Sequence, residues 1–415
     1  MKKTAIVLGA GSRGCAYADY SLNCPQQLEI VGVAEPNESR RKVFAEKYHV
    51  PAGRCYSHWK EILEQPRMAD AAFVCTMDDM HTEPAILALK KGYHVLLEKP
   101  MSNTPEECLE IEKAARESGR VLTVCHVLRY TSFYCTLKKL IEDGAVGEVA
   151  TIDQIENVGF WHQAHSFVRG NWRNSRESSP MILQKSCHDL DIISWLIDKP
   201  CRWISSFGTL MHFDAAHAPQ GAPDNCMKGC PHSERCPYYA PRIYLNGNTQ
   251  WPVSVLTTDL TEAGIRRALE EGPYGRCVYH CDNDVVDHQV VNMEYEGGVT
   301  ASFTMTAFTA DMTRQLKIMG TRGQITADMD ANVIRLQRFG EEERMVPIQS
   351  SEADEFGHGG GDYGIVVNFL GLMDGKGDNR TSAKASLQSH LMCFAAEKSR
   401  LEHRTISMEE MEQLK

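Results

Sequence analysis

The sequence predicts an α/β protein in two parts, an N-terminal domain built on a parallel sheet and a C-terminal domain built on a mostly antiparallel sheet. Three observations support this prediction. The chain has 415 residues, more than the roughly 250–300 at which a single hydrophobic core stops growing. Apolar strand-like runs alternate with helical stretches over the first third, as in successive β-α units. After Gly147, strand candidates follow one another with few helices between them.

The first domain is expected at residues 1–125. Its strand candidates are continuous runs rich in Val, Ile and Leu, as expected for strands covered on both faces. They are 4–11, 28–35, 71–76, 94–99 and 121–126. Helical stretches separate them, one beginning at Arg13 and the others covering Ser39–Tyr48, Glu83–Lys91 and Pro105–Ser118. This alternation predicts β-α units on a parallel sheet.

The second domain is expected at residues 126–415. Its strand candidates are 149–160, 203–213, 285–298, 299–308, 314–329 and 332–339. Tight turns at 296–298 and 321–323 join neighbouring candidates as hairpins, which predicts a mostly antiparallel sheet. Apolar residues repeat at helical spacing over Ser179–Leu196, so a helix is expected before most of the sheet. A Pro/Gly/Cys-rich insertion is expected at 214–276.

The composition is that of a globular protein and narrows the classes of partner. Apolar residues make up 42% and charged residues 24%, and no stretch approaches the ~20 uninterrupted apolar residues that span a bilayer. The opening MKKTAIVLGAG runs directly into glycines without a cleavage site, which predicts a strand rather than a signal peptide. The net charge of −11 disfavours nucleic acid. We expect a cytoplasmic protein that acts on a small molecule, with no nucleic acid or membrane as partner.

A glycine-rich turn after the first strand predicts a dinucleotide site. Gly9, Gly11 and Gly14 lie in the hexapeptide GAGSRG between a strand and a helix, with Ser12 and Arg13 at the helix start. In this context the glycines allow a tight turn, close approach of a pyrophosphate and close helix packing. Glu35 ends the second strand about 20 residues beyond Gly14, where a carboxylate binds the adenosine ribose. NAD is therefore favoured over NADP, although Arg40 and Arg41 leave NADP open.

Further motifs resemble those of the Gfo/Idh/MocA oxidoreductases, the relatives of glucose-fructose oxidoreductase and inositol 2-dehydrogenase. They are the stretch from Thr76 to His81, the tripeptide Glu98-Lys99-Pro100, and His188 with Asp191 on a later helix. The resemblance covers essentially the whole chain. It implies a C-terminal α/β domain with a large open sheet, a substrate between the domains and homo-oligomers formed through that sheet. It also adds Thr76, His81, Glu98 and Lys99 to the expected cofactor-binding residues.

Lys99 and His188 are the expected catalytic residues. Oxidising a secondary alcohol requires a side chain that takes the hydroxyl proton as hydride leaves the carbon, and the resemblance implies that Lys99 lies at that oxygen and His188 beside it. Asp191 shares the helix face of His188. Many members of the family read D-x-G-x-H-x-x-D here, whereas this chain has Gln184 in place of the acid, followed by Lys185. Lys185 is expected to bind substrate or to take over proton transfer.

Several polar residues are candidates for substrate binding. His126, Arg129 and Tyr130 follow the last strand of the first domain, with interdomain packing as the alternative. A polar and aromatic loop carries His162, His165, Trp172 and Arg173, as sugar-binding loops do. His288, beside Asp287 in a strand candidate, faces either the cleft or an edge of the sheet. Gln184 and Asp191 complete this set. His358 and Asp362, in the pentapeptide HGGGD, indicate either pocket closure or a plain turn.

One group of cysteines differs from the other thiols, which are dispersed along expected strands and helices. Cys226, Cys230 and Cys236 lie close together in the insertion, with His232, Cys277 and Cys281 as further donors. Soft ligands over a short loop predict a structural zinc site, with an iron–sulfur cluster or unliganded reduced cysteines as alternatives.

Three functions remain open from the sequence. The first is an NAD-dependent dehydrogenase that oxidises a ring hydroxyl of a sugar, glycoside or polyol. The second is a redox-neutral glycosidase that retains NAD, oxidises the sugar transiently, eliminates, adds across the weakened bond and returns the hydride; the resemblance includes such enzymes. The third is a non-catalytic NAD-binding regulator, which would leave Lys99 and His188 without a role.

Overall fold

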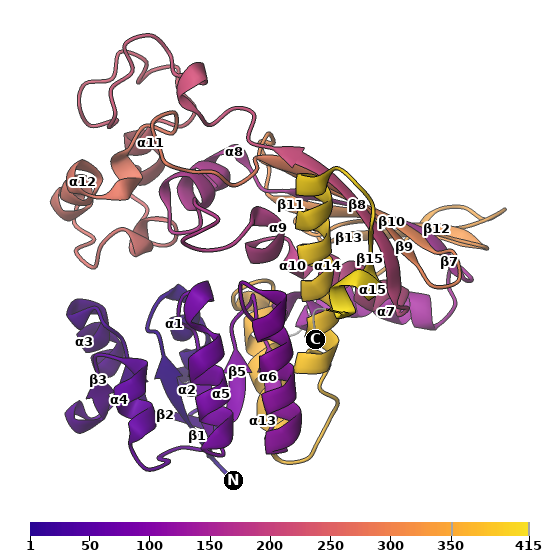
Figure 1. The fold of residues 1–415 in the computed structure, drawn as a ribbon, viewed down its shortest axis with the longest axis horizontal. Helices are drawn as coiled ribbons and strands as arrows, with labels where there is room; N and C mark the ends of the chain where they lie inside the picture. The colour runs from indigo at the N-terminus through magenta and orange to yellow at the C-terminus, as the bar shows by residue number, and fades with distance from the viewer. Residues whose placement is uncertain (350–351, 414–415) are drawn as a thin grey trace.

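The computed structural model describes residues 1–349 and 352–413 and has two layered parts, drawn one above the other in Figure 1. The N-terminal part contains a parallel sheet of six strands in the order β3-β2-β1-β4-β5-β6. Its strands are β1 (Lys3–Leu8), β2 (Leu28–Ala34), β3 (Cys55–Tyr56), β4 (Ala71–Val74), β5 (His94–Leu97) and β6 (Leu122–Val124). The strand order reverses beside β1, where sheets of this kind bind ligands at the carboxyl ends of their strands.

Helices cover both faces of the parallel sheet. One face packs against α1 (Ser12–Ala18), α2 (Tyr20–Asn23), α3 (Glu38–Lys47) and α13 (Gly361–Met373). The other packs against α4 (Trp59–Glu64), α5 (Thr82–Lys90) and α6 (Pro105–Ser118). Helix α13 comes from the far end of the chain, yet Ile365, Val366 and Phe369 share a core with β1, and Figure 1 shows α13 among the N-terminal helices. The N-terminal fold is thus completed by a segment beyond the expected boundary at residue 125.

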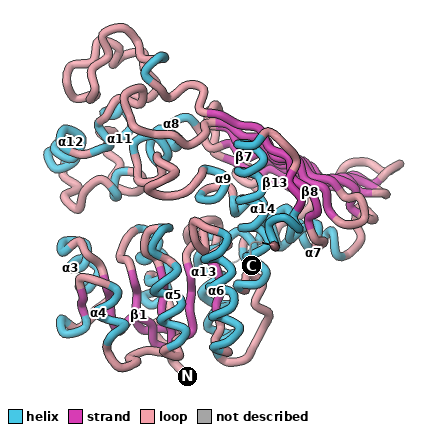
Figure 2. Tube along the Cα trace, in the orientation of Figure 1, coloured by secondary structure: helices cyan, strands magenta, loops and turns pink. Residues whose placement is uncertain are grey.

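The second part contains a nine-stranded sheet in the order β14-β13-β12-β11-β7-β10-β9-β8-β15 (Figure 2). Only β7 and β10 pair in parallel, and the other neighbours are antiparallel. The strands are β7 (Val149–Asn157), β8 (Cys201–Thr209), β9 (His288–Tyr295), β10 (Thr300–Thr306), β11 (Thr313–Gly320), β12 (Gly323–Asp328), β13 (Val333–Arg338), β14 (Arg344–Met345) and β15 (Ile406–Ser407). The predicted fold class is therefore confirmed in both parts.

One face of the second sheet is buried and the other is open. The buried face alternates with the exposed face along each strand and packs against α7 (Ser132–Glu142), α10 (Cys187–Ile197) and α14 (Ala383–Glu402). On the open face, strand register places Ile155, Thr304, Val290 and Phe207 in one row across β7, β10, β9 and β8. Ile155, Val290 and Phe207 are exposed. Short helix α15 (Met408–Glu412) follows β15.

Two predicted elements differ from the structure. The single helix expected over Ser179–Leu196 is two helices, α9 (Met181–Gln184) and α10, because the chain leaves helical geometry at Lys185 and Ser186. His288 does not lie in mid-strand but opens β9. The segment between β8 and β9 contains α11 (Ala240–Tyr244) and α12 (Glu262–Glu271), while α8 (Phe160–His162) leads into a π-helix, Gln163–Arg169. Over the described ranges, none of the helices has the length and apolar character to cross a bilayer.

Candidate active site

The turn after β1 has the shape that a dinucleotide requires. Gly9 has φ +95°, and a Cβ atom there would lie 2.3 Å from the carbonyl oxygen of Cys75. A Cβ atom on Gly14 would lie 2.0 Å from the carbonyl oxygen of Gly9, so the helix sits on the strand as closely as backbone allows. Around Gly11, in contrast, the space is open. These residues therefore fit a ligand that approaches the backbone at Gly11.

Glu35 is buried at the end of β2, next to this turn. Its carboxylate accepts hydrogen bonds from the backbone N–H groups of Ala10, at 2.9 Å, and Asn37, at 3.0 Å. Arg41 lies nearby, but its guanidinium donates to the carbonyl oxygens of Glu35 and Pro36. Of the two cations that left NADP open in the sequence, Arg41 is thus engaged by the backbone.

Arg13 binds two carboxylates from distant parts of the chain. Its Nε lies 2.6 Å from Glu98 Oε1, and its Nη2 lies 2.6 Å from Asp362 Oδ1. Burial alone would raise the pKa of each acid, but Arg13 and a second cation, Lys99 for Glu98 and His358 for Asp362, hold both pKa values below the ordinary range. Glu98 Oε2 also accepts the backbone N–H of Lys99 at 2.8 Å. Arg13 therefore connects the cofactor loop to the lysine motif.

Thr76 and His81 lie at the carboxyl end of β4. The His81 ring is buried between the carbonyl oxygens of Pro100, at 2.7 Å, and Thr76, at 3.0 Å, and the Thr76 hydroxyl donates to Met80. His81 thus joins the ends of β4 and β5. The Lys99-Pro100 peptide bond at the end of β5 is cis.

The Lys99 ammonium is fixed by the break between α9 and α10. Its Nζ donates to the backbone carbonyl of Gln184 at 2.6 Å. The Gln184 side chain is buried, and its amide nitrogen donates to the carbonyl oxygens of Trp172, at 2.9 Å, and Ser179, at 3.0 Å. The resemblance places an acid at this position. In this chain the side-chain amide of Gln184 is hydrogen-bonded to backbone carbonyls instead, and the backbone carbonyl of Gln184 binds Lys99.

His188 lies in the first turn of α10 and is almost fully buried. Burial, followed by the neighbouring Lys99, His126 and Arg314, holds its pKa well below the ordinary value. His188 is therefore a neutral imidazole near pH 7, and its Nδ1 has no hydrogen-bond partner among the described residues. A neutral imidazole beside an ammonium can accept a proton while the ammonium orients an oxygen atom.

Lys185 belongs to a buried cluster of four charges. Its Nζ lies 2.8 Å from Glu156 Oε1 on β7. Arg314, the partner of Glu156 across β7 and β11, has its Nε 2.8 Å from both Glu156 Oε2 and Asp189 Oδ1. Burial raises the pKa of Asp189 to about 6 despite Arg314. Two cations thus balance two carboxylates beside the catalytic candidates.

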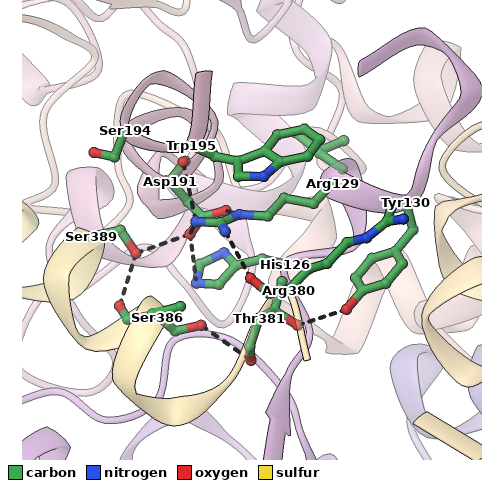
Figure 3. Close-up of polar contacts among 12 residues, drawn as sticks. His126, Arg129, Tyr130, Asp191, Ser194, Trp195, Arg380, Thr381, Ser386 and Ser389 are labelled. Atoms are coloured by element: carbon green, nitrogen blue, oxygen red, sulfur yellow. Dashed lines mark hydrogen bonds and ion pairs between the residues drawn. The ribbon is translucent and has the colours of Figure 1, made fainter. Parts of the chain in front are cut away.

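His126, Arg129, Tyr130 and Asp191 lie together where the two parts of the chain meet (Figure 3). Asp191 is fully buried and accepts from Arg129 Nε at 2.6 Å and Nη2 at 2.7 Å. Figure 3 shows His126 beneath this ion pair and Tyr130 hydrogen-bonded to Thr381. Burial lowers the pKa of His126 to about 4. This arrangement favours the packing alternative of the sequence analysis, and contact of these residues with substrate stays a prediction.

The polar loop divides into two groups. His165 is buried, with Nδ1 2.9 Å from the Tyr244 hydroxyl and its ring stacked on Tyr274 at 4.8 Å. His162 packs edge-on against Trp251, and burial, followed by Lys185, lowers its pKa. Trp172 and Arg173 lie elsewhere: the Trp172 indole donates weakly to Asp78, and Arg173 pairs with Asp282 at 2.9 Å. Because Lys185 contributes to the lowered pKa of His162, this histidine lies near the Lys185 cluster.

His288 extends from the start of β9, with Nδ1 2.8 Å from Asp287 Oδ1. Asp287 is fully buried and its other oxygen accepts the backbone N–H groups of Met211 and His212. The acid therefore orients the histidine at the end of the sheet.

Four residues of the site were missed in the sequence. Glu156, Asp189 and Arg314 are charged residues on a buried face, and strand alternation could have flagged Glu156 and Arg314. Asp78, inside the Thr76–His81 stretch, was also missed. It is buried and accepts the hydroxyl of Ser178 at 3.1 Å, which ties the β4–α5 loop to the segment before α9.

The cysteine cluster does not support the predicted zinc site. Cys226, Cys230, Cys236 and Cys277 line one small cavity with Arg169, but across residues 1–349 and 352–413 no three His, Cys, Asp or Glu side chains form a group that could hold a metal ion. The thiols instead make separate contacts: Cys226 Sγ lies 3.8 Å from Arg169 Nη2, and Cys281 donates to the carbonyl of Cys277. The donors do not fit a metal as they stand.

Sequence profiles of one family match both parts of the chain. The profile described as "Oxidoreductase family, NAD-binding Rossmann fold" matches residues 3–126. The profile described as "Oxidoreductase family, C-terminal alpha/beta domain" matches residues 138–408. Together the matches cover nearly the whole chain, in the order expected from the two sheets.

Individual relatives agree with these profiles. The putative oxidoreductase YteT of Bacillus subtilis is 26% identical over 364 residues, covering 83% of this chain and 82% of YteT. The 2,7-anhydro-N-acetylneuraminate hydratase of Escherichia coli is 27% identical over 202 residues, about half of each chain. The structure of the WlbA dehydrogenase of Bordetella pertussis, in complex with NADH and UDP-GlcNAcA, superposes with a TM-score of 0.70 over 98% of this chain and 99% of WlbA. At 17% identity, this likeness shows the fold alone.

Proposed function

The chain belongs to the Gfo/Idh/MocA oxidoreductase family, and on this premise we propose that it oxidises a ring hydroxyl of a sugar, glycoside or polyol with NAD. The observation that carries the proposal is the pairing of Lys99, fixed by the Gln184 carbonyl at 2.6 Å, with the neutral His188. Catalysis gives this neutral, buried imidazole beside an ammonium a role, whereas non-catalytic regulation does not.

The residues divide the reaction between them. NAD⁺, when bound at the turn after β1, would supply the hydride acceptor for the hydroxyl-bearing carbon. Lys99 donates a hydrogen bond to the hydroxyl oxygen and stabilises the negative charge that develops there. His188, a neutral imidazole, accepts the hydroxyl proton. The alcohol thus loses a hydride and a proton and becomes a ketone.

NAD is proposed rather than NADP because of Glu35. Its carboxylate is held by two backbone N–H groups at the end of β2 and would repel a 2′-phosphate. Arg41 is turned to backbone carbonyls instead of toward a phosphate. Titration with both dinucleotides tests this part: tighter binding of NADP would contradict it.

Substitution of Lys99 tests the catalytic assignment. Lys99→Ala removes the group that orients the hydroxyl, so we expect turnover to fall at least about a thousandfold, with the affinity for NAD retained. Single-turnover NADH formation and NAD titration measure the two quantities. Retained turnover would refute the role of Lys99.

A second candidate is the redox-neutral glycosidase, and one observation favours it. The Lys185–Glu156 pair is a second set of acid and base groups beside Lys99 and His188. Elimination next to an oxidised carbon needs such an extra base. A relative named as a hydratase is compatible with such chemistry. Incubation with aryl glycosides separates the candidates: stoichiometric NADH without cleavage supports the dehydrogenase, and aglycone release without net NADH supports the glycosidase.

We further propose that copies of the chain associate through the open face of the second sheet, in the cytoplasm. The exposed apolar row formed by Ile155, Val290 and Phe207, with Trp203 alongside, supports association. All fifteen cysteines are free thiols, as in a reducing compartment. Sedimentation of Phe207→Asp against the unchanged protein tests association; an identical sedimentation coefficient would contradict it.

A further inference from the structure

The segment 357–362 lies against the cofactor loop although it comes from the far end of the chain. It leads into α13, which packs beside α1 on the parallel sheet. Its glycines allow very close packing: a Cβ atom on Gly361 would lie 2.4 Å from the carbonyl oxygen of Val127, and one on Gly357 would lie 2.3 Å from Asp362 Oδ2. The segment is therefore packed tightly against Val127, which follows the last strand of the N-terminal sheet.

His358 is held in a backbone conformation that non-glycine residues rarely adopt. Its φ is +54°, and Gly359 and Gly360 follow with φ +59° and +84°. Such left-handed residues persist where the surrounding structure over-determines them, and they cluster at functional sites. The strain alone does not identify a ligand, so the surroundings of the ring decide.

The His358 ring is anchored on one side only. Its Nδ1 lies 3.0 Å from Asp362 Oδ2 and 3.3 Å from Arg13 Nη1. About half of the side chain, 46%, is exposed, and the contacts recorded for the ring within the described chain all use Nδ1. The Nε2 edge of the ring is thus open to a ligand.

The charged groups next to the ring already bind one another. Arg13 is the arginine of the glycine-rich turn, and its guanidinium donates to Glu98, Asp362 and the Tyr17 hydroxyl. Most of its donors are therefore engaged within the chain. The Nε2 edge of His358 is left as a further donor next to the turn.

We propose that His358 is a cofactor ligand supplied by the C-terminal part of the chain, whose Nε2–H donates to a phosphate oxygen of the bound dinucleotide. Asp362 is a positioning residue that accepts the Nδ1–H of the ring, and Arg13 in turn holds Asp362. Segment 357–362 acts as a clasp, because the ligand contacts residues from both ends of the sequence. The proposal rests on the proposed use of NAD and concerns its binding, independent of the sugar.

The affinity and release of NADH test this role on the full-length protein. We expect His358→Ala to weaken NADH binding about tenfold, as for loss of a charge-assisted hydrogen bond, and to speed its dissociation by a similar factor. Fluorescence titration and stopped-flow displacement measure the two quantities. His403→Ala is a matched control, since His403 is also exposed at φ +54° and ends α14; it should leave both values unchanged.

A second variant separates the ring from the backbone. Asn tolerates the left-handed region, so His358→Asn keeps the clasp conformation and removes the imidazole; we expect it to bind NADH nearly as weakly as His358→Ala. Wild-type affinity and release in both variants would overturn the proposal, as would an equal loss in His403→Ala. If the unchanged protein binds neither NADH nor NADPH, the proposed use of NAD fails instead, and the clasp fails with it.

Discussion

Two partly buried arginines, one in each part of the molecule, each lie between two carboxylates, and they differ in what surrounds the acids. Arg13 joins Glu98 and Asp362 at the cofactor turn. Arg314 joins Glu156 and Asp189 on the second sheet. The first cluster connects positions up to 349 residues apart, whereas the second rests on adjacent strands and the helix that covers them.

The groups next to each acid explain why the pKa values shift in opposite directions in the two clusters. Glu98 and Asp362 each have a cation besides Arg13, namely Lys99 and His358, and their pKa values fall despite burial. In the second cluster the extra cation, Lys185, contacts Glu156 and not Asp189. Asp189 shares its arginine with another carboxylate, so burial prevails and its pKa rises to about 6. The acids of the first cluster therefore stay ionised near pH 7, whereas Asp189 in the second cluster can bind and release a proton.

Removal of the two arginines should separate the clusters most clearly. Arg13→Met removes the arginine that two buried carboxylates share, so we expect a loss of about 3 kcal/mol in the free energy of unfolding. Arg314→Met should cost less, about 2 kcal/mol, because Lys185 still pairs with Glu156 and Asp189 can bind a proton. Urea denaturation at pH 7 measures both.

Arg404 provides the matched surface control. It also lies between two carboxylates, Glu402 and Glu410, but in solvent. Arg404→Met should change stability little, since solvent screens exposed ion pairs. A larger loss for Arg314→Met than for Arg13→Met would contradict the comparison.

Loss of Lys185 should show whether this residue moves a proton or only balances the charge of Glu156. Lys185→Met leaves Arg314 facing two carboxylates, and if Lys185 moves a proton, kcat should fall about 10- to 100-fold with NAD affinity unchanged. Lys185→Arg keeps the charge and should restore stability but not turnover. Steady-state kinetics and denaturation together measure this. Unchanged kcat in Lys185→Met would reduce Lys185 to a counter-ion of Glu156.

The titration of Asp189 should produce the smallest effect. Its pKa is about 6 in the folded chain and about 4 when unfolded, so its contribution to stability is fully present below about pH 4 and is lost as pH rises through about 6. Between pH 5 and 7 this amounts to about 1 kcal/mol. Asp189→Asn should abolish that slope, measured by denaturation across the range. An unchanged slope would show that another group titrates.

The cofactor end of the site was predictable because its determinants are local. Gly9, Gly11 and Gly14 are set by one strand-turn-helix connection, and Glu35 by the end of the next strand. Both sheets also followed from alternation and hairpin turns, and the matched family profiles confirm the resemblance.

The proton-handling end was not predictable in the same way, because its contacts are set by strand register and chain return. Arg314 meets Glu156 through the pairing of β11 with β7, and Arg13 meets Asp362 because α13 returns to the first sheet. Gln184 looked like a lost acid, but its carbonyl rather than its side chain holds Lys99. The cysteines lay close in sequence, and closeness alone did not produce a set of metal ligands.

The return of α13 to the first sheet bears on how the chain is made. Ile365, Val366 and Phe369 cover apolar surface of strands completed within the first hundred residues. During synthesis, the part of that sheet face that α13 covers stays exposed until residues 361–373 leave the ribosome. At about 5–20 residues per second, this interval lasts on the order of tens of seconds. The N-terminal part is thus the first to be translated and among the last to be finished, and its exposed face in that interval is a surface for chaperones to shield.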